Sequence, residues 1–139
     1  MTKMDVAMAF FHDCESLKGS EGCSKYTADG ATFEAQAEPI MDIRSLLEYC
    51  DWMAGLGSTA LKGCSYKINA AAFDEDTSTA LVFGTFTGKH VGDGGPVPPT
   101  NKETAAHYVY AITVNDDQKI SHMTKVWNAP WTLGELGWT

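Results

Sequence analysis

The thiol and imidazole side chains, which most readily act as metal ligands or nucleophiles, are scattered along this chain. Cys14, Cys23, Cys50 and Cys64 are irregularly spaced and form no C-x-x-C pair, so the spacing typical of zinc or redox sites is absent. Because a free thiol behaves as a small apolar side chain, we interpret all four as core residues. His12 lies close to Cys14, but two ligands without a second pair do not define a site, and we assign no metal and no cofactor.

A second stretch that could carry chemistry is the glycine- and proline-rich segment 88–101. It lacks both the G-K-[ST] sequence and a following helix, so we do not expect it to bind phosphate. Glycine permits positive φ and proline fixes an extended backbone without a donor, so the segment predicts a rigid loop between two strands. His90 lies at the start of this loop, where it either takes part in chemistry or orders the loop.

Long strands are predicted on both sides of this loop. Residues 79–87 and 105–114 are rich in β-branched and aromatic side chains, as strands are. Neither stretch alternates cleanly between apolar and polar residues, which indicates a sheet covered on both faces. Further strands are predicted over 31–35, 66–73 and 119–127.

Helical patterns come mainly before these strands. Thr2 and Asp5 have the spacing of a capping box, and an apolar stripe after them predicts a helix over 3–18. Asp42 is placed to cap a second helix over 42–55, which Gly55 and Gly57 would end. Trp52 lies nearly opposite the apolar stripe of that helix, so it packs half-buried against a neighbour or forms the wall of a pocket or subunit interface.

The order of elements indicates one α+β domain spanning residues 1–139. Helices come first, a sheet of mostly consecutive strands follows, and residues 129–138 predict a short terminal helix. The chain carries 18 acidic against 10 basic residues, a net charge of −8, which argues against a nucleic-acid partner. No apolar run approaches the roughly 20 residues of a membrane span, and no secretory signal is evident, so we expect a cytoplasmic protein without membrane contact.

The second half of the chain resembles a known family. Gly88-Lys89-His90-Val91-Gly92, Pro98-Pro99-Thr100, the strand through Tyr110, and Lys119-Ile120 with Trp127-Asn128 resemble the SnoaL-like polyketide cyclase group of the NTF2-like superfamily. The resemblance implies a cone-shaped α+β fold, in which a curved antiparallel sheet wraps around the N-terminal helices and encloses an apolar pocket. It also implies a homodimer through the outer sheet face.

In the cyclases of this group, a His and an Asp on two late strands act as acid and base. Carried across by spacing, these positions fall on Tyr110 and Lys125, whose usual pKa values of about 10 and about 10.4 make them poor proton acceptors near neutral pH. The resemblance therefore implies Tyr110, Lys125 and the retained His90 as candidate catalytic residues. Because the His and Asp of the cyclases are replaced here, the resemblance does not imply cyclisation by that pair.

Strand alternation extends this candidate site. If Tyr110 faces the pocket, Tyr108 lies beside it, and an inward Lys125 carries Ser121, Met123 and Trp127 inward with it. The predicted ligand-binding residues are Phe33, Tyr108, Met123, Trp127 and Trp52. Lys125 then lies at the polar end of the pocket, where burial would lower its pKa, or reaches solvent at the rim.

The predicted function is the binding of a small apolar or carbonyl compound in this pocket. The alternative is a SnoaL-like enzyme, a cyclase, isomerase or hydrolase, that uses non-standard pocket residues. The opposite face of the sheet would carry His107, Val109, Ala111, His122, Thr124 and Val126. Because the 105–114 strand has no polar face, we expect a second copy of the chain to cover this side of the sheet.

Overall fold

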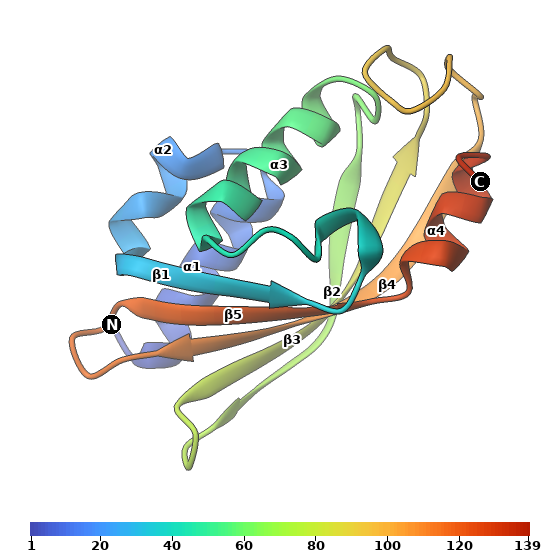
Figure 1. The fold of residues 1–139 in the computed structure, drawn as a ribbon. Helices are drawn as coiled ribbons and strands as arrows, with labels where there is room; N and C mark the ends of the chain where they lie inside the picture. The colour runs from blue at the N-terminus through green and yellow to red at the C-terminus, as the bar shows by residue number, and fades with distance from the viewer.

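The computed structural model describes residues 1–139 and shows helices packed against one side of a curved sheet (Figure 1). The predicted α+β cone is confirmed. The elements are α1 (Lys3–Glu15), α2 (Gly19–Cys23), β1 (Thr27–Ala35), α3 (Leu46–Ser58), β2 (Ser65–Asp74), β3 (Thr79–Lys89), β4 (Glu103–Val114), β5 (Ile120–Trp127) and α4 (Ala129–Leu136), with single 3-10 turns at Ser24–Tyr26 and Glu38–Ile40.

The sheet has the strand order β1-β5-β4-β3-β2. The pairs from β2 to β5 are antiparallel, as expected. β1 departs from the expected pattern because it pairs with β5 in parallel, with Phe33 opposite Met123. β1 also begins at Thr27, earlier than the predicted strand over 31–35. β1 forms the edge of the sheet beside β5, and the 3-10 turn at Glu38–Ile40 lies between β1 and α3.

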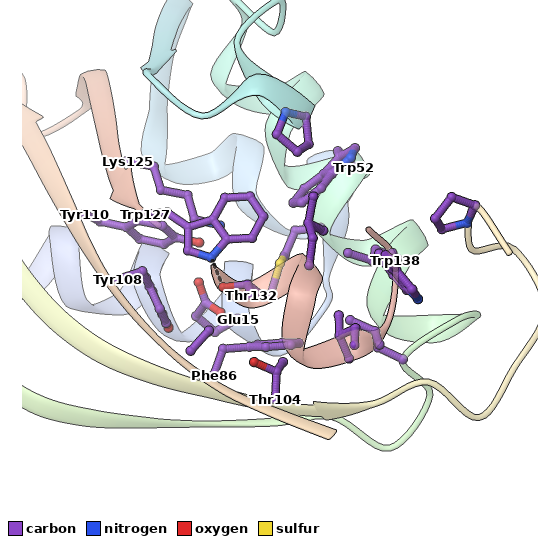
Figure 2. Close-up of a pocket in the computed structure, with 18 residues that line it drawn as sticks. Glu15, Trp52, Phe86, Thr104, Tyr108, Tyr110, Lys125, Trp127, Thr132 and Trp138 are labelled. Atoms are coloured by element: carbon purple, nitrogen blue, oxygen red, sulfur yellow. Dashed lines mark hydrogen bonds between the residues drawn. The ribbon is translucent and has the colours of Figure 1, made fainter. Parts of the chain in front are cut away.

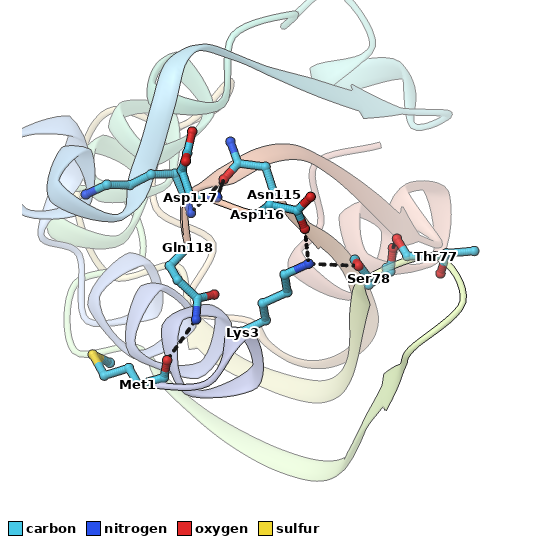
Figure 3. Close-up of polar contacts among 10 residues, drawn as sticks. Met1, Lys3, Thr77, Ser78, Asn115, Asp116, Asp117 and Gln118 are labelled. Atoms are coloured by element: carbon cyan, nitrogen blue, oxygen red, sulfur yellow. Dashed lines mark hydrogen bonds and ion pairs between the residues drawn. The ribbon is translucent and has the colours of Figure 1, made fainter.

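The start of α1 is fixed by its own cap and by two distant turns. Asp5 N donates to Thr2 Oγ1 at 3.0 Å and Thr2 N donates to Asp5 Oδ2 at 2.9 Å, which completes the predicted capping box. Lys3 Nζ bonds Ser78 Oγ at 3.1 Å and Asp116 Oδ1 at 2.9 Å (Figure 3). The helix is thereby tied to the turns after β2 and after β4. It ends at Glu15, three residues before the predicted end.

α3 begins and ends later than the sequence predicts. Its N-cap is Ser45, whose Oγ accepts from Glu48 N at 3.3 Å, and Asp42 is not the cap. The carbonyl of Arg44 accepts from Phe33 N at 2.8 Å, which holds the preceding residues against β1 in a non-helical path. Gly55 and Gly57 both lie inside the helix rather than after it. A Cβ at Gly57 would lie 2.6 Å from a methyl group of Leu17. This glycine permits close packing and does not stop the helix.

The core fills the space between the helices and the concave face. On β4 the buried residues alternate along the strand and are Thr104, Ala106, Tyr108, Tyr110, Ile112 and Val114. On β5 the pairing shifts between Thr113 and Val114, so that Ile120 is buried and Ser121 is only partly covered. The expected inward position of Ser121 is therefore wrong, because an irregularity in the pairing interrupts the alternation.

The cysteines are free thiols, of which Cys14, Cys23 and Cys50 are buried and Cys64 is half-buried. No group of three or more His, Cys, Asp or Glu side chains is arranged to hold a metal ion. None of the helices combines the length and the apolar character needed to cross a bilayer.

The outer face of β3, β4 and β5 leads to a prediction about assembly. Leu81, Phe83 and Val126 are exposed there. The outward positions along the middle of these strands carry no Asp, Glu, Lys or Arg. A chain with a net charge of −8 repels its own copies least at such an uncharged face, so we propose that a second copy covers it. Light scattering is expected to give twice the chain mass of 15.1 kDa.

Leu81→Lys is expected to return the protein to a monomer, because it places a charge in the proposed contact. Met41→Lys alters an equally exposed apolar residue between the 3-10 turn at 38–40 and α3, and is expected to leave the mass unchanged. A wild-type monomer at every concentration tested would rule out this assembly.

Candidate functional site

Two neighbouring strands place four large side chains on the concave face. Tyr110 lies directly opposite Lys125, and Tyr108 lies opposite Trp127. Across the next strand pair, Tyr108 lies opposite Gly84, where a Cβ would be only 2.9 Å from the phenol oxygen. The missing side chain at Gly84 therefore gives the ring of Tyr108 room to lie across the sheet.

These strands form one wall of a cavity of about 350 Å³. α3 and α4 supply the facing walls, and Lys125, Tyr110 and Trp127 lie together at one end while Trp138 lies at the other (Figure 2). The lining is mostly apolar, and its 18 residues are Glu15, Pro39, Trp52, Met53, Leu56, Leu61, Phe86, Pro96, Thr104, Ala106, Tyr108, Tyr110, Lys125, Trp127, Thr132, Leu133, Leu136 and Trp138.

Lys125 is buried, with 7% of its surface exposed. Its Nζ donates a hydrogen bond to Tyr49 Oη at 3.0 Å, and Tyr49 Oη lies 2.5 Å from Tyr110 Oη. Five aromatic rings surround the amine, with centroids at 4.4 Å for Trp127, 5.2 Å for Tyr49, 5.6 Å for Trp52, 5.6 Å for Tyr108 and 5.9 Å for Tyr110. Burial nevertheless dominates and lowers the pKa of Lys125 to about 8.

Glu15, at the end of α1, is the only carboxyl group of the cavity wall, with 4% of its surface exposed. Neither carboxyl oxygen has a hydrogen-bond partner, and the chain's only ion pairs lie elsewhere. Burial raises the pKa of Glu15, and the nearby hydroxyls of Tyr110 and Tyr108 and the charge of Lys125 oppose this effect only in part. A buried carboxyl without a direct partner favours its neutral form.

The wall formed by Trp127 is held in position by the start of α4. The indole Nε1 donates to Thr132 Oγ1 at 2.8 Å, and Thr132 Oγ1 donates to the carbonyl of Asn128 at 3.1 Å. Asn128 also caps α4, because its Oδ1 accepts from Trp131 N at 3.2 Å. The ring of Trp127 meets Trp52 of α3 edge to face, with centroids 6.4 Å apart. The terminal helix therefore orients a cavity wall as well as closing the cone.

Five of the predicted site residues line the cavity: Tyr108, Tyr110, Lys125, Trp127 and Trp52. Phe33 and Met123 are buried outside its lining. Phe33 stacks on Tyr49 with centroids 4.4 Å apart, so it supports the ring that holds the amine of Lys125.

His90 is fully buried but is not part of the cavity lining. Its Nδ1 accepts hydrogen bonds from Trp138 Nε1 at 2.9 Å and from Thr100 N at 3.3 Å. Because Nδ1 accepts both bonds, the neutral ring carries its proton on Nε2. His90 thus joins the loop after β3 to the C-terminal segment, which agrees with the loop-ordering role considered for it.

Sequence reasoning missed Glu15 and Tyr49, which contribute most directly to the polar end. Glu15 lies four residues after the buried Phe11, so a carboxylate on the apolar face of α1 was a readable signal. Tyr49 and Met53 belong to the buried face of α3 and lie inside the predicted helix, but the contact of Tyr49 with Lys125 depends on packing between elements that the sequence does not show. Leu133, Leu136 and Trp138 of the C-terminal segment gave no signal, because nothing local shows which face they cover.

Comparisons with known proteins support the fold. No family model matches the chain, and no curated protein matches it. Among solved structures, IdmH, a candidate polyketide cyclase from Streptomyces antibioticus, has a TM-score of 0.75 at 14% identity and covers 99% of both chains. A candidate SnoaL-like polyketide cyclase from Jannaschia sp. CCS1 has a TM-score of 0.75 at 11% identity, covering 96% of this chain and 90% of that one.

An NTF2-like protein from Burkholderia thailandensis has a TM-score of 0.75 at 14% identity, covering 99% of this chain and 98% of that one. The chain therefore has the fold of the SnoaL-like group among the NTF2-like proteins, as the resemblance implied. At these identities the likeness defines the fold alone.

The buried amine predicts an unusual pH dependence of stability. The pKa of Lys125 falls from its ordinary 10.5 to about 8 in the fold, so between these pH values the unfolded chain binds more protons and stability rises with pH. Relative to Lys125→Met, the free energy of unfolding of the wild type is expected to rise by about 3 kcal/mol across this window. Urea unfolding of both proteins at several pH values measures the difference, and a constant difference would contradict the burial of the amine.

Proposed function

We propose that this protein binds a small, largely apolar carbonyl compound in the cavity beneath α3 and α4. The observation that carries the proposal is a set of unpartnered polar atoms in an apolar lining. Five buried side-chain oxygen or nitrogen atoms lack a hydrogen-bond partner, and four of them belong to the lining residues Glu15, Thr104 and Tyr108. Buried polar groups are normally paired, so a ligand that supplies partners at these positions removes a substantial free-energy cost.

The dimensions of the cavity suit a small ligand. Its volume of about 350 Å³ lies at the lower end of the usual range for small-molecule sites, which is about 300–1,000 Å³. The apolar walls supply affinity through buried area, at about 25 cal/mol per Å², while the polar end orients one functional group. A carbonyl oxygen suits this end, because it accepts from the hydroxyl of Tyr108 or from a neutral Glu15.

An enzyme acting on such a compound is the second candidate. Lys125, with a pKa lowered to about 8, and Glu15, with a raised pKa, are the kind of buried ionisable pair found in active sites. The chemistry would differ from that of the family pair, because an amine and a phenol occupy the two strand positions. Proton NMR of each compound in large excess over the protein distinguishes the two functions, since an enzyme converts the excess into a product over time whereas a binding protein does not.

The binding proposal predicts unequal effects of substitutions in the cavity wall. Trp127→Ala is expected to weaken the binding of an aromatic aldehyde or ketone by about tenfold or more, because it removes a large wall. Tyr108→Phe is expected to cost about 0.5–1.5 kcal/mol, because it removes one neutral hydrogen bond. Isothermal titration calorimetry measures both changes.

Trp131→Phe is the matched control, since Trp131 is half-exposed on α4 and is not part of the lining. Its affinities are expected to equal those of the wild type. If a ligand binds both cavity variants as tightly as the wild type, its binding site lies elsewhere on the molecule.

A further inference from the structure

Lys125 is the one buried lysine of the chain, and its amine is exceptional in three respects. It belongs to the wall of the cavity, it makes a single hydrogen bond, and no carboxylate pairs with it. With a pKa of about 8, about a tenth of the amine is neutral at pH 7, against about one part in three thousand for an ordinary lysine. A neutral amine that donates one hydrogen to Tyr49 Oη keeps its lone pair free for another partner.

The carboxyl of Glu15 lies in the wall of the same cavity, and it too forms no ion pair. Both its oxygens are buried without a hydrogen-bond partner, and the raised pKa keeps part of it protonated at pH values where an ordinary carboxyl is fully ionised. A desolvated lysine and a carboxylic acid in the wall of one cavity are the two groups that imine formation requires, a nucleophile and a proton donor.

We propose that Lys125 forms a covalent imine with the carbonyl carbon of an aldehyde or ketone bound in the cavity, with Glu15 as the proton donor. The inference rests on the proposed binding of a carbonyl compound and names the chemistry of that same site. Tyr49 positions the amine through its hydrogen bond at 3.0 Å. The ring of Tyr49 is held in turn by its stack on Phe33.

The reaction balances without any other reactant. The lone pair of Nζ attacks the carbonyl carbon and forms the N–C bond, while Glu15 protonates the carbonyl oxygen. The nitrogen then returns a proton to the Glu15 carboxylate, which gives a neutral carbinolamine. Glu15 protonates the hydroxyl group, the nitrogen lone pair forms the C=N bond as the C–O bond breaks, and water leaves. The resulting iminium returns its proton to the Glu15 carboxylate, which gives the imine and restores the acid. The net change is the exchange of one carbonyl oxygen for the lysine nitrogen with release of one water.

The lining also defines the class of carbonyl compound. The chain's single arginine, Arg44, is not part of the cavity wall, so no guanidinium is present to bind a carboxylate or phosphate. The buried carboxyl of Glu15 further disfavours an anionic ligand. The compound is therefore an uncharged aldehyde or ketone whose remaining groups are apolar and pack against Trp52, Trp127 and Phe86.

Reductive trapping tests the inference. The full-length protein is incubated at pH 7 with benzaldehyde, or with cyclohexanone as a ketone probe, and sodium cyanoborohydride, which reduces an iminium carbon to a stable secondary amine. Intact-mass analysis is expected to show a single rapid addition, and peptide mapping is expected to place it on Lys125. Lys125→Met should abolish the rapid addition, whereas Lys62→Met, which alters an exposed lysine, should leave it unchanged.

Glu15→Gln tests the proton donor separately from binding. The maximal trapping rate at saturating benzaldehyde is expected to fall by about 100-fold, while the benzaldehyde concentration that gives half the maximal rate stays within about twofold of the wild type. A merely structural role for Glu15 would instead change both quantities. Equal trapping rates in the wild type and in Glu15→Gln would overturn its assignment as proton donor.

Parallel calorimetry with the same probes, without reductant, separates the possible failures. Probe binding without a rapid addition at Lys125 would overturn the imine and leave the proposed binding function standing. Absence of both binding and addition would overturn both proposals. Slow labelling spread equally over the exposed lysines, and unchanged in Lys125→Met, would also overturn the imine, because it would be ordinary surface chemistry.

Discussion

The burial of the Lys125 amine without an ion pair sets the requirements that the surrounding structure meets. Moving an ammonium group out of water is costly, and here the compensation comes from the nearby carboxyl of Glu15, from one hydrogen bond to Tyr49 and from the negative faces of five aromatic rings. These terms reduce the cost without removing it, since the pKa of Lys125 still falls to about 8. The residual cost favours the neutral form of the amine, so the unfavourable burial of the Lys125 ammonium and the proposed imine chemistry have the same origin.

The geometry of the site also depends on the position of α1, because this helix carries the carboxyl of Glu15. Glu15 is the last residue of that helix, so its position depends on how the helix is held at the other end. The capping box at Thr2 and the contacts of Lys3 with two distant turns fix that end. A helix of 13 residues is rigid enough to carry this constraint to its C-terminus. The polar contacts of Lys3 (Figure 3) and the carboxyl of Glu15 in the cavity wall (Figure 2) therefore lie at the two ends of the same helix, α1.

Of the patterns in the sequence, strand alternation predicted the candidate site best. A period of two along β4 and β5 brings Tyr108, Tyr110, Lys125 and Trp127 to one face, and the pairing register agrees. The same rule failed at Ser121, where an irregular pairing leaves no local signature. Contributions from other layers were harder to foresee, because the side chain of Tyr49 or Trp138 reaches the site only through tertiary packing. The parallel pairing of β1 was missed for the same reason, since it joins segments far apart in the chain.

The exchange of functional groups relative to the resembling cyclases changes what the same fold can do. The resemblance implies a carboxylate on the last strand and an imidazole on the strand beside it, whereas this chain has Lys125 and Tyr110 there. The carboxyl group of this cavity comes instead from Glu15 on a helix that faces the sheet. The proposed nucleophile and proton donor thus lie on different layers of the cone, in the wall of one cavity. Such an arrangement favours attack on a carbonyl carbon from the sheet side and proton delivery to its oxygen from the helix side, a division of roles that two groups on adjacent strands do not provide.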